Sequence, residues 1–290
     1  MDRYINCMAH GSSEGNLLIG ETHTALIDCG MAFCAAGTIQ NVEKALGGRP
    51  LDYIFFSHTH YDHIGALPFF KAKWPGARVV TSEAGAAVLL KDTPRRVIRE
   101  LSLAAAKANN AALDTSYDDD VFKADITVKE GDCIDLGGLT VRVIETPGHT
   151  RDSLSFYAPE IETLILNETP GVLMPDGIVY PCYLTSYTDT ISAIEKCRGI
   201  PYKYLSLPHF GITDAETADG FFDKAMAANI GCRDYILSMN KKNLGETEML
   251  NSYFQKYGSD MLLRYQPKEA FMANARATIA CTLREVEQQN

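Results

Sequence analysis

Apolar positions in the first third of the chain alternate between runs typical of strands and runs typical of helices. Strands are predicted at residues 4–8, 17–20, 22–30, 52–57 and 77–82. Helices are predicted at residues 38–48, 65–74 and 83–91. The first of these helices has Ile39, Val42 and Leu46 on one side and ends in two glycines, a common helix stop signal. Such alternation predicts α/β layers.

The pattern changes after residue 91. Residues 92–120 combine Ala-rich helical spacing with an Asp-rich turn, and we predict a helical insertion lying over the sheet. Further strands are predicted at residues 124–128, 133–136, 139–146, 153–158, 163–167 and 203–207, and a further helix is predicted at 189–199.

The last part of the chain has a helical pattern. It runs from Ala215 almost to the end, in about three segments broken near Asn243–Gly245 and Gly258–Ser259. We therefore divide the chain into a layered domain, residues 1–212, and a helical C-terminal cap, residues 213–290. The apolar faces of the cap helices must be buried, either over the layered domain as a lid or in a homodimer interface.

A dense group of polar side chains directly follows the buried strand 52–57. The stretch "SHTHYDHIGAL" contains His58, His60, Asp62 and His63. So many imidazoles and carboxylates cannot form a packed core without hydrogen-bond partners or a metal. His58 and His60 lie two apart on an extended segment and can face one ion, whereas Asp62 and His63 come after the turn and can reach a second ion.

Three more candidate ligands follow the ends of other predicted strands. His149 follows strand 139–146, Glu168 follows strand 163–167, and His209 follows strand 203–207. Strand ends are the usual position of active-site residues in layered α/β folds. His10 and His23 lie in the N-terminal strand region, and we assign them to turns rather than to the site.

Composition excludes several classes of function. The 290-residue chain has a formal net charge of −10, which argues against a general nucleic-acid or anionic-membrane surface. The first residues lack the pattern of a secretion signal, and no apolar stretch is long enough to cross a membrane. The eight cysteines include no CxxC pair, which favours a cytoplasmic protein with reduced thiols, and we expect Cys133 and Cys281 to fill the core.

In combination, these segments resemble the metallo-β-lactamase superfamily. "SHTHYDHIGAL" is similar to its HxHxDH signature, "TPGHT" and "LPHFG" to its later ligand segments, and "NLLIGETHTALIDCG" to its opening hairpin and aspartate, here Asp28. The resemblance implies an αββα sandwich with a two-metal centre. It implies that one metal is held by His58, His60 and His149, and the other by Asp62, His63 and His209.

Two positions depart from the family pattern. Glu168 stands where the family usually has an aspartate that bridges both metals, so it either bridges them or binds only one. Phe210 stands where a small residue is common. With nitrogen and carboxylate donors, we expect two divalent ions, zinc in preference to iron or manganese.

The arrangement of the insertion and the C-terminal helices resembles the quinolone-signal thioesterase subgroup of that family. This resemblance implies a hydrolase for a thioester or ester of a small-molecule acyl substrate, with hydroxide made at the metal site as the nucleophile and Asp62 orienting it. Tyr183, Tyr187 and Phe210 are candidate substrate contacts, although the two tyrosines also suit a loop anchored by buried aromatic rings. The alternatives are a phosphodiester or lactone hydrolase and a non-catalytic, metal-containing regulatory binding protein.

Overall fold

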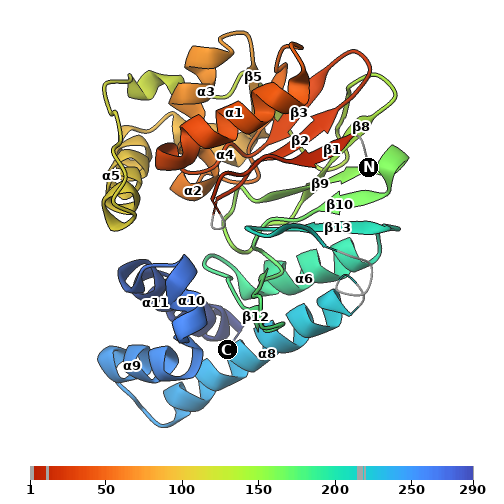
Figure 1. Cartoon of the computed structure of the whole chain (residues 1–290). Helices are drawn as coiled ribbons and strands as arrows, with labels where there is room; N and C mark the ends of the chain where they lie inside the picture. Colours follow the sequence, from red (N-terminus) through yellow and green to blue (C-terminus); the bar gives the residue numbers. More distant parts are fainter. Residues whose placement is uncertain (1–2, 11–12, 214–217, 219, 290) are drawn as a thin grey trace.

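The computed structural model describes residues 3–10, 13–213, 218 and 220–289. Two β-sheets pack face to face, helices cover the outer face of each sheet, and further helices follow at the C-terminus (Figure 1). This arrangement confirms the predicted αββα sandwich with C-terminal helices.

The first sheet contains the N-terminal strands in sequence order. They are β1 (Tyr4–Asn6), β2 (Asn16–Ile19), β3 (Thr24–Ile27), β4 (Tyr53–Phe55), β5 (Arg78–Ser82) and β6 (Ile126–Val128). β1, β2 and β3 pair antiparallel, whereas β3, β4, β5 and β6 pair parallel. The carboxyl ends of β3 and β4 therefore meet at one edge of the sheet, where the histidine-rich segment begins.

The second sheet has the order β14-β13-β10-β9-β8-β7. Its strands are β7 (Cys133–Asp135), β8 (Thr140–Glu145), β9 (Leu154–Ala158), β10 (Thr163–Ile165), β13 (Tyr204–Leu207) and β14 (Gly211–Thr213). β10 and β13 pair parallel, and the other neighbours pair antiparallel. β10 and β13 therefore end side by side and bring the residues after them together.

The space between the sheets is filled by side chains from both. Phe55 of β4 lies edge-on to Phe156 of β9, with ring centroids 5.4 Å apart, and both are buried. Leu18 and Val80 of the first sheet belong to the same cluster as Val143 of the second. Burial of such side chains is the main favourable term that holds the two sheets together.

The helices of the layered domain lie on the outer faces of the sheets or at the edge of the domain. They are α1 (Ala35–Leu46), α2 (Tyr61–Ile64), α3 (Leu67–Lys73), α4 (Glu83–Leu89), α5 (Asp92–Ala108) and α6 (Tyr187–Arg198), with short 3-10 turns η1 (Ala32–Cys34), η2 (Asp119–Val121) and η3 (Pro159–Ile161). α1 and α3 pack on the first sheet through Val42 and Phe70, and α6 packs on the second through Ile194.

The C-terminal helices differ in number from the prediction. Four helices are described, α8 (Phe221–Lys241), α9 (Glu246–Tyr257), α10 (Asp260–Tyr265) and α11 (Lys268–Gln289). The two predicted breaks are present, but the third segment is itself broken before Pro267, because proline has no N–H and forces Gln266 into an extended conformation. Residues 215–217, at the predicted start, lie outside the described residues. No described helix is long and apolar enough to cross a membrane.

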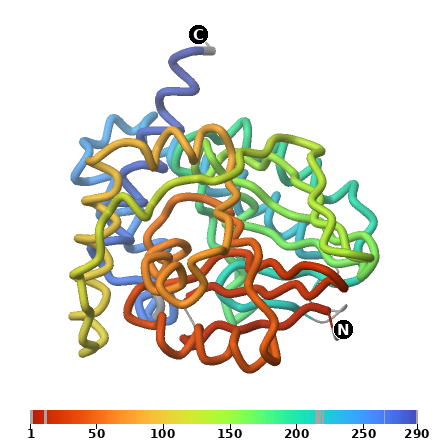
Figure 2. Tube along the Cα trace, turned by 90° about the horizontal axis from the view of Figure 1, so that it is seen from above, coloured from red at the N-terminus to blue at the C-terminus, as the bar shows by residue number. Residues whose placement is uncertain are grey.

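The predicted insertion is helical only in its first part, and it does not lie over the sheet. α5 packs against α2, α4 and η1, at the edge of the layered domain. Figures 1 and 2 show α5 (yellow) on the same side of the molecule as the C-terminal helices (blue). Cys133 is also misassigned as a core residue: it is exposed on the edge strand β7, whereas the other seven cysteines are buried.

The sequence did not predict a short hairpin and one further short strand. β11 (Val172–Leu173) and β12 (Val179–Tyr180) form a hairpin around "MPDG", a turn sequence that could have revealed it. β14 pairs with β13 immediately after His209, whose φ of 66° makes the tight reversal. Both elements lie next to the predicted ligand segments.

The core of the C-terminal helices predicts a stability effect. Phe271 is fully buried among aromatic rings of α9 and β12, so Phe271→Ala should lower the free energy of unfolding by about 3–5 kcal/mol through lost burial and a cavity. Leu103→Ala, on the exposed face of α5, should change it by less than about 0.5 kcal/mol. Urea denaturation measures both values, and equal values would contradict this packing.

Candidate metal centre

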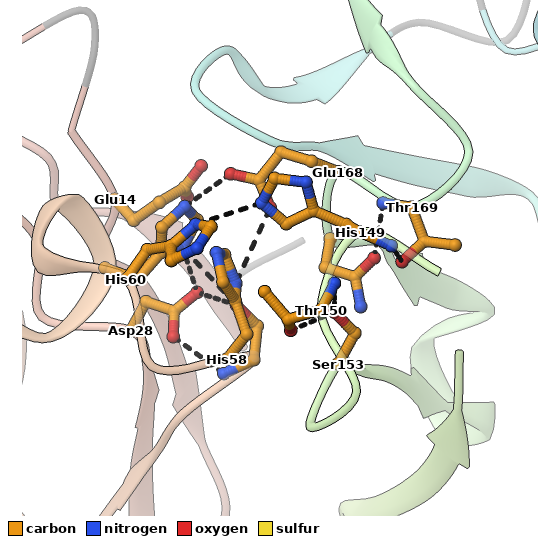
Figure 3. A network of polar contacts seen from close by, with 12 residues as sticks. Glu14, Asp28, His58, His60, His149, Thr150, Ser153, Glu168 and Thr169 are labelled. Atoms are coloured by element: carbon orange, nitrogen blue, oxygen red, sulfur yellow. Dashed lines mark hydrogen bonds and ion pairs between the residues drawn. The ribbon is translucent and has the colours of Figure 1, made fainter. Parts of the chain in front are cut away.

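The predicted ligands converge from both sheets. His58 and His60 lie between β4 and α2, His149 follows β8, Glu168 follows β10, and His209 lies between β13 and β14. In Figure 3 the labelled histidines and Glu168 point toward one another across the gap between the two sheets. Because the strand ends meet there, residues more than a hundred positions apart share one site.

The first group consists of His58, His60 and His149. One nitrogen of each ring lies within 4.8 Å of the others, and the group could hold a metal ion. His149 Nδ1 is 2.7 Å from the carbonyl of Cys182, so it carries the proton and donates to that oxygen. The unprotonated Nε2 of His149 then faces His60 Nδ1 at 3.0 Å. A lone-pair nitrogen directed at its neighbours is what a metal ion requires.

The loop that carries His149 needs a glycine. Gly148 has a φ of 143°, and a Cβ there would lie 2.1 Å from the hydroxyl of Thr190. The main-chain N–H of His149 donates to the hydroxyl of Thr169, 3.2 Å away. This close approach to α6 and to the loop after β10 holds the His149 ring over the centre.

The second group consists of Asp62, His63, Glu168 and His209. One ligand atom from each lies within 4.8 Å of the others. Glu168 Oε1 lies 2.5 Å from His63 Nε2 and 3.1 Å from His209 Nε2, and Asp62 Oδ2 lies 4.0 Å from His63 Nε2. The division into two groups matches the pairing that the family resemblance implies, with Glu168 added to the second.

Glu168 also faces the first group. Its Oε2 lies 3.6 Å from His58 Nδ1, so its two oxygens are directed at different groups. Among the described residues, neither that oxygen nor His58 Nε2 nor His209 Nδ1 has a hydrogen-bond partner, although all three atoms are buried. Buried polar atoms are rarely left unsatisfied, and these atoms are nitrogen and carboxylate donors suited to a divalent ion. The residues therefore fit a metal centre.

Asp28 supports the second group from below. Its φ of 58° turns the chain at the end of β3, and its carboxylate accepts from His63 Nδ1 at 2.9 Å. It also accepts from the N–H and hydroxyl of Ser57 at 2.8 and 2.6 Å. Asp28 thus directs His63 Nε2 toward Glu168. The family resemblance had marked this aspartate, but the sequence had not shown it as a site residue.

Glu14 holds the ligand His209 in place, and the sequence did not predict this role. Its buried carboxylate accepts from the main-chain N–H of His209, and its other oxygen accepts from Asn16 at 3.2 Å. Asn16 in turn accepts from the hydroxyl of Tyr4 at 2.7 Å, which contacts Ser206 of β13 at 2.8 Å. A glutamate in a Gly- and Ser-rich turn gives no sequence signal for this role.

The pKa values of the histidines in the centre are shifted in opposite directions. Burial lowers the pKa of His149 to about 4 and that of His58 well below its ordinary value. Burial also opposes a charge on His63, but Glu168 and Asp28 outweigh it and raise the pKa of His63 well above the ordinary value. Burial likewise opposes the charge of Glu168, yet His63 and His58 hold its pKa well below its usual range. His63 and Glu168 therefore form a buried ion pair.

A cavity of about 220 Å³ opens above both groups. Its floor includes His60, Asp62, His149, Glu168 and His209, and its walls are mostly apolar. Since a water molecule occupies about 30 Å³ in the liquid, the cavity has room for an organic group beside the centre. α5, α10 and α11 all contribute wall residues, so the C-terminal helices cover the site.

Of the three predicted substrate contacts, only Phe210 lines this cavity. Tyr183 is fully buried, and its hydroxyl contacts Thr282 of α11 at 3.0 Å. Tyr187 begins α6 and lines a separate surface pocket with Arg233, whose guanidinium lies 5.1 Å from its ring centroid. The main-chain N–H of Tyr187 donates to Glu285 of α11 at 2.9 Å. Both tyrosines therefore anchor α11 to the layered domain, which is the alternative that their sequence context left open.

Comparison with known proteins identifies the family. The family model described as Metallo-beta-lactamase superfamily matches residues 16–209, and the chain belongs to this superfamily. It is 30% identical over 206 residues to a metallo-beta-lactamase fold-containing protein of Sulfurisphaera tokodaii, with 68% of this chain and 72% of that protein covered. It is also 30% identical over 135 residues to a hydroxyacylglutathione hydrolase of Rhodopseudomonas palustris, but this match covers 47% of this chain and only 39% of that relative's length.

A solved structure shows that the similarity of fold extends over the whole chain. A metallo-beta-lactamase family protein of Thermus thermophilus superposes with a TM-score of 0.63, covering 100% of this chain and 94% of that one, at 18% identity. The similarity therefore includes the helices beyond residue 209.

The hydrogen bond from His209 to Glu14 predicts that one substitution of Glu14 weakens metal binding more than another. Glu14→Ala leaves the buried N–H of His209 without its acceptor and should weaken metal binding by about tenfold or more, since an unpaired buried donor costs about 1–3 kcal/mol. Glu14→Gln keeps an acceptor oxygen and should bind metal more nearly like the wild type. A competition titration with a chelator measures both affinities, and equal affinities for the wild type and Glu14→Ala would contradict the role.

The raised pKa of His63 predicts proton release on metal binding. At pH 7 the metal-free protein holds this proton, and a ligand nitrogen must lose it, so metal affinity should fall as the pH is lowered. Zinc titration by calorimetry in two buffers of different ionisation enthalpy should show at least about one proton released per chain. Asp28→Asn removes one cause of the raised pKa and should reduce the release; binding without any release would disprove the ion pair.

Proposed function

We propose that this protein is a metal-dependent hydrolase of acyl bonds, most simply of a thioester or ester. The observation that carries the proposal is the combination of two adjacent metal-ligand groups with an apolar cavity directly above them. Ligand sites of enzymes are typically apolar pockets with a few convergent polar groups.

We assign His58, His60 and His149 to one divalent ion, and Asp62, His63 and His209 to a second. Glu168 lies between the groups and is assigned to both. The histidine-rich donor set favours zinc, with iron or manganese as alternatives. When bound, such ions acidify water and polarise a carbonyl oxygen.

The side chains of this protein orient the reactants. Asp62 is partly exposed at the floor of the cavity, and we assign its carboxylate to accept a proton from the attacking water and hold it in line with the acyl carbon. The Cys182 carbonyl and Asp28 keep the Nδ1 protons on His149 and His63, so that both Nε2 atoms face the centre. The apolar walls exclude bulk water from the reacting carbonyl.

Two similarities support acyl chemistry. One relative is a hydroxyacylglutathione hydrolase, and this chain matches 39% of its length. The insertion and the C-terminal helices resemble those of the quinolone-signal thioesterase in their order along the chain, and in this protein α10 and α11 form a wall of the cavity. From the second similarity we infer the class of reaction, hydrolysis of a thioester or ester, but not the identity of the acyl group.

A phosphodiester substrate fits the cavity less well. No Lys or Arg occurs among the described residues that line it, so a phosphate has no cationic side chain to pair with. Arg151, the cation nearest to His149 in sequence, lines a different surface pocket beside α4. A lactone is an internal ester and falls within the proposed class, whereas a regulatory binding protein would hold a ligand there without turning it over.

The assignment predicts which variants lose activity. His60→Ala and Asp62→Asn should each lower kcat/KM for a generic aryl ester or thioester by at least about 100-fold, because each removes a ligand or the orientation of water. Tyr187→Phe, outside the cavity, should retain activity within about twofold. Circular dichroism checks the fold of each variant.

Metal removal supplies the control for these variants. Chelation should abolish turnover, and divalent ions should restore it in the wild type but not in His60→Ala. Full activity in His60→Ala or Asp62→Asn would refute the mechanism, and a metal-loaded wild type that turns over no ester or thioester would favour the binding protein.

A further inference from the structure

We propose that the cavity accepts an uncharged, flexible aliphatic acyl chain and that the small side chains of α11 set its maximum length. This inference rests on the proposed hydrolase function, because it assigns the substrate class of the same site. It goes beyond that function in naming the wall of the cavity that selects the substrate.

The walls of the cavity are apolar on several sides. Apolar side chains come from four separate parts of the fold: the η1–α2 region, α5, the β11–β12 hairpin with the loop after β13, and α10. They include Met31, Tyr61, Leu101, Met174, Phe210 and Leu262. Two methionines and two leucines around one opening favour a flexible aliphatic chain, because thioether and branched aliphatic side chains adapt to apolar groups of varied shape.

The lining also lacks a partner for a charged substrate. Away from the metal ligands, the polar groups of the described lining are the amides of Gln266 and Asn274, the hydroxyls of Tyr61 and Tyr180, and the thiol of Cys182. None of these groups pairs with a carboxylate or phosphate as Arg or Lys does. The end of the acyl chain that enters the cavity is therefore uncharged.

Small side chains of α11 form one wall. Ala270, Ala273 and Asn274 lie three and four positions apart, so they share one helical face, and all three line the cavity. Phe271 and Ala275 lie on another face and are buried in the core of the C-terminal helices. Ala273 is exposed, and its methyl group lines the open cavity. A larger side chain at this position would occupy space that a long acyl chain needs.

The test is a series of 4-nitrophenyl esters with acyl chains from acetyl to dodecanoyl and the metal-loaded enzyme. Each methylene buried in the cavity should raise kcat/KM by about fourfold until the cavity is full. Ala273→Phe should shift the optimum to shorter chains and lower kcat/KM for the best wild-type substrate by about tenfold or more, with a smaller loss for each shorter chain. Ala280→Phe is the matched control, since Ala280 is an exposed residue of α11 outside the cavity lining, and it should leave the profile unchanged.

A binding measurement separates this inference from the proposed function. Calorimetric titration of the metal-loaded protein with butyrate and octanoate compares chains that share one head group, and octanoate should bind more tightly in the wild type but not in Ala273→Phe. Ester turnover with a flat chain-length profile and equal binding of the two acids would overturn the inference and leave the hydrolase intact. Chain-length-dependent binding without ester or thioester turnover would overturn the hydrolase and support the selective cavity.

Discussion

The centre of this protein depends on one buried carboxylate. Glu168 is 3% exposed, and its two oxygens face histidines from both ligand groups. A buried carboxylate is costly unless it is paired and hydrogen-bonded, and here the pairing groups come from two other segments, which carry His58 and His63 on one and His209 on the other. The site therefore forms only when the two sheets pack against each other. This packing positions every group that the proposed chemistry uses.

A second set of residues holds these groups in place. Asp28 and Glu14 are not among the residues that line the cavity, yet each carboxylate accepts a hydrogen bond from a ligand residue. Asp28 accepts from the ring of His63, and Glu14 accepts from the main-chain N–H of His209. Burial raises the pKa of Glu14 to about 7, opposed by His209 and His63. Such supporting groups align the ligand atoms before any ion binds, which reduces the cost of binding.

How much the sequence predicts differs between the floor and the walls of the site. His58, His60, Asp62 and His63 lie within six residues directly after an apolar strand, a pattern that can be recognised without a structure. Glu14 carries no such pattern, because its partner is a main-chain group almost two hundred residues away. For Tyr183 the sequence left two readings open, a substrate contact or a buried anchor, because aromatic residues near a ligand segment have the same sequence pattern in a cavity wall as in a core.

The C-terminal helices connect the fold to the choice of substrate. Their heptad-like apolar spacing predicts burial but not the surface that buries them, and Pro267 introduces a turn between α10 and α11 that the periodicity did not show. That turn brings Leu262 and Ala273 to the same cavity as the metal ligands. The layered domain thus supplies the reactive groups, and the helices beyond it supply much of the apolar wall.

The most direct test of this account is the number of metal ions bound per chain, measured by elemental analysis of protein loaded with zinc and freed of excess ion. A glutamate that faces both ligand groups predicts two ions per chain, and Glu168→Ala should reduce that number. One ion per chain in the wild type, or two that persist in Glu168→Ala, would contradict the central role of this carboxylate.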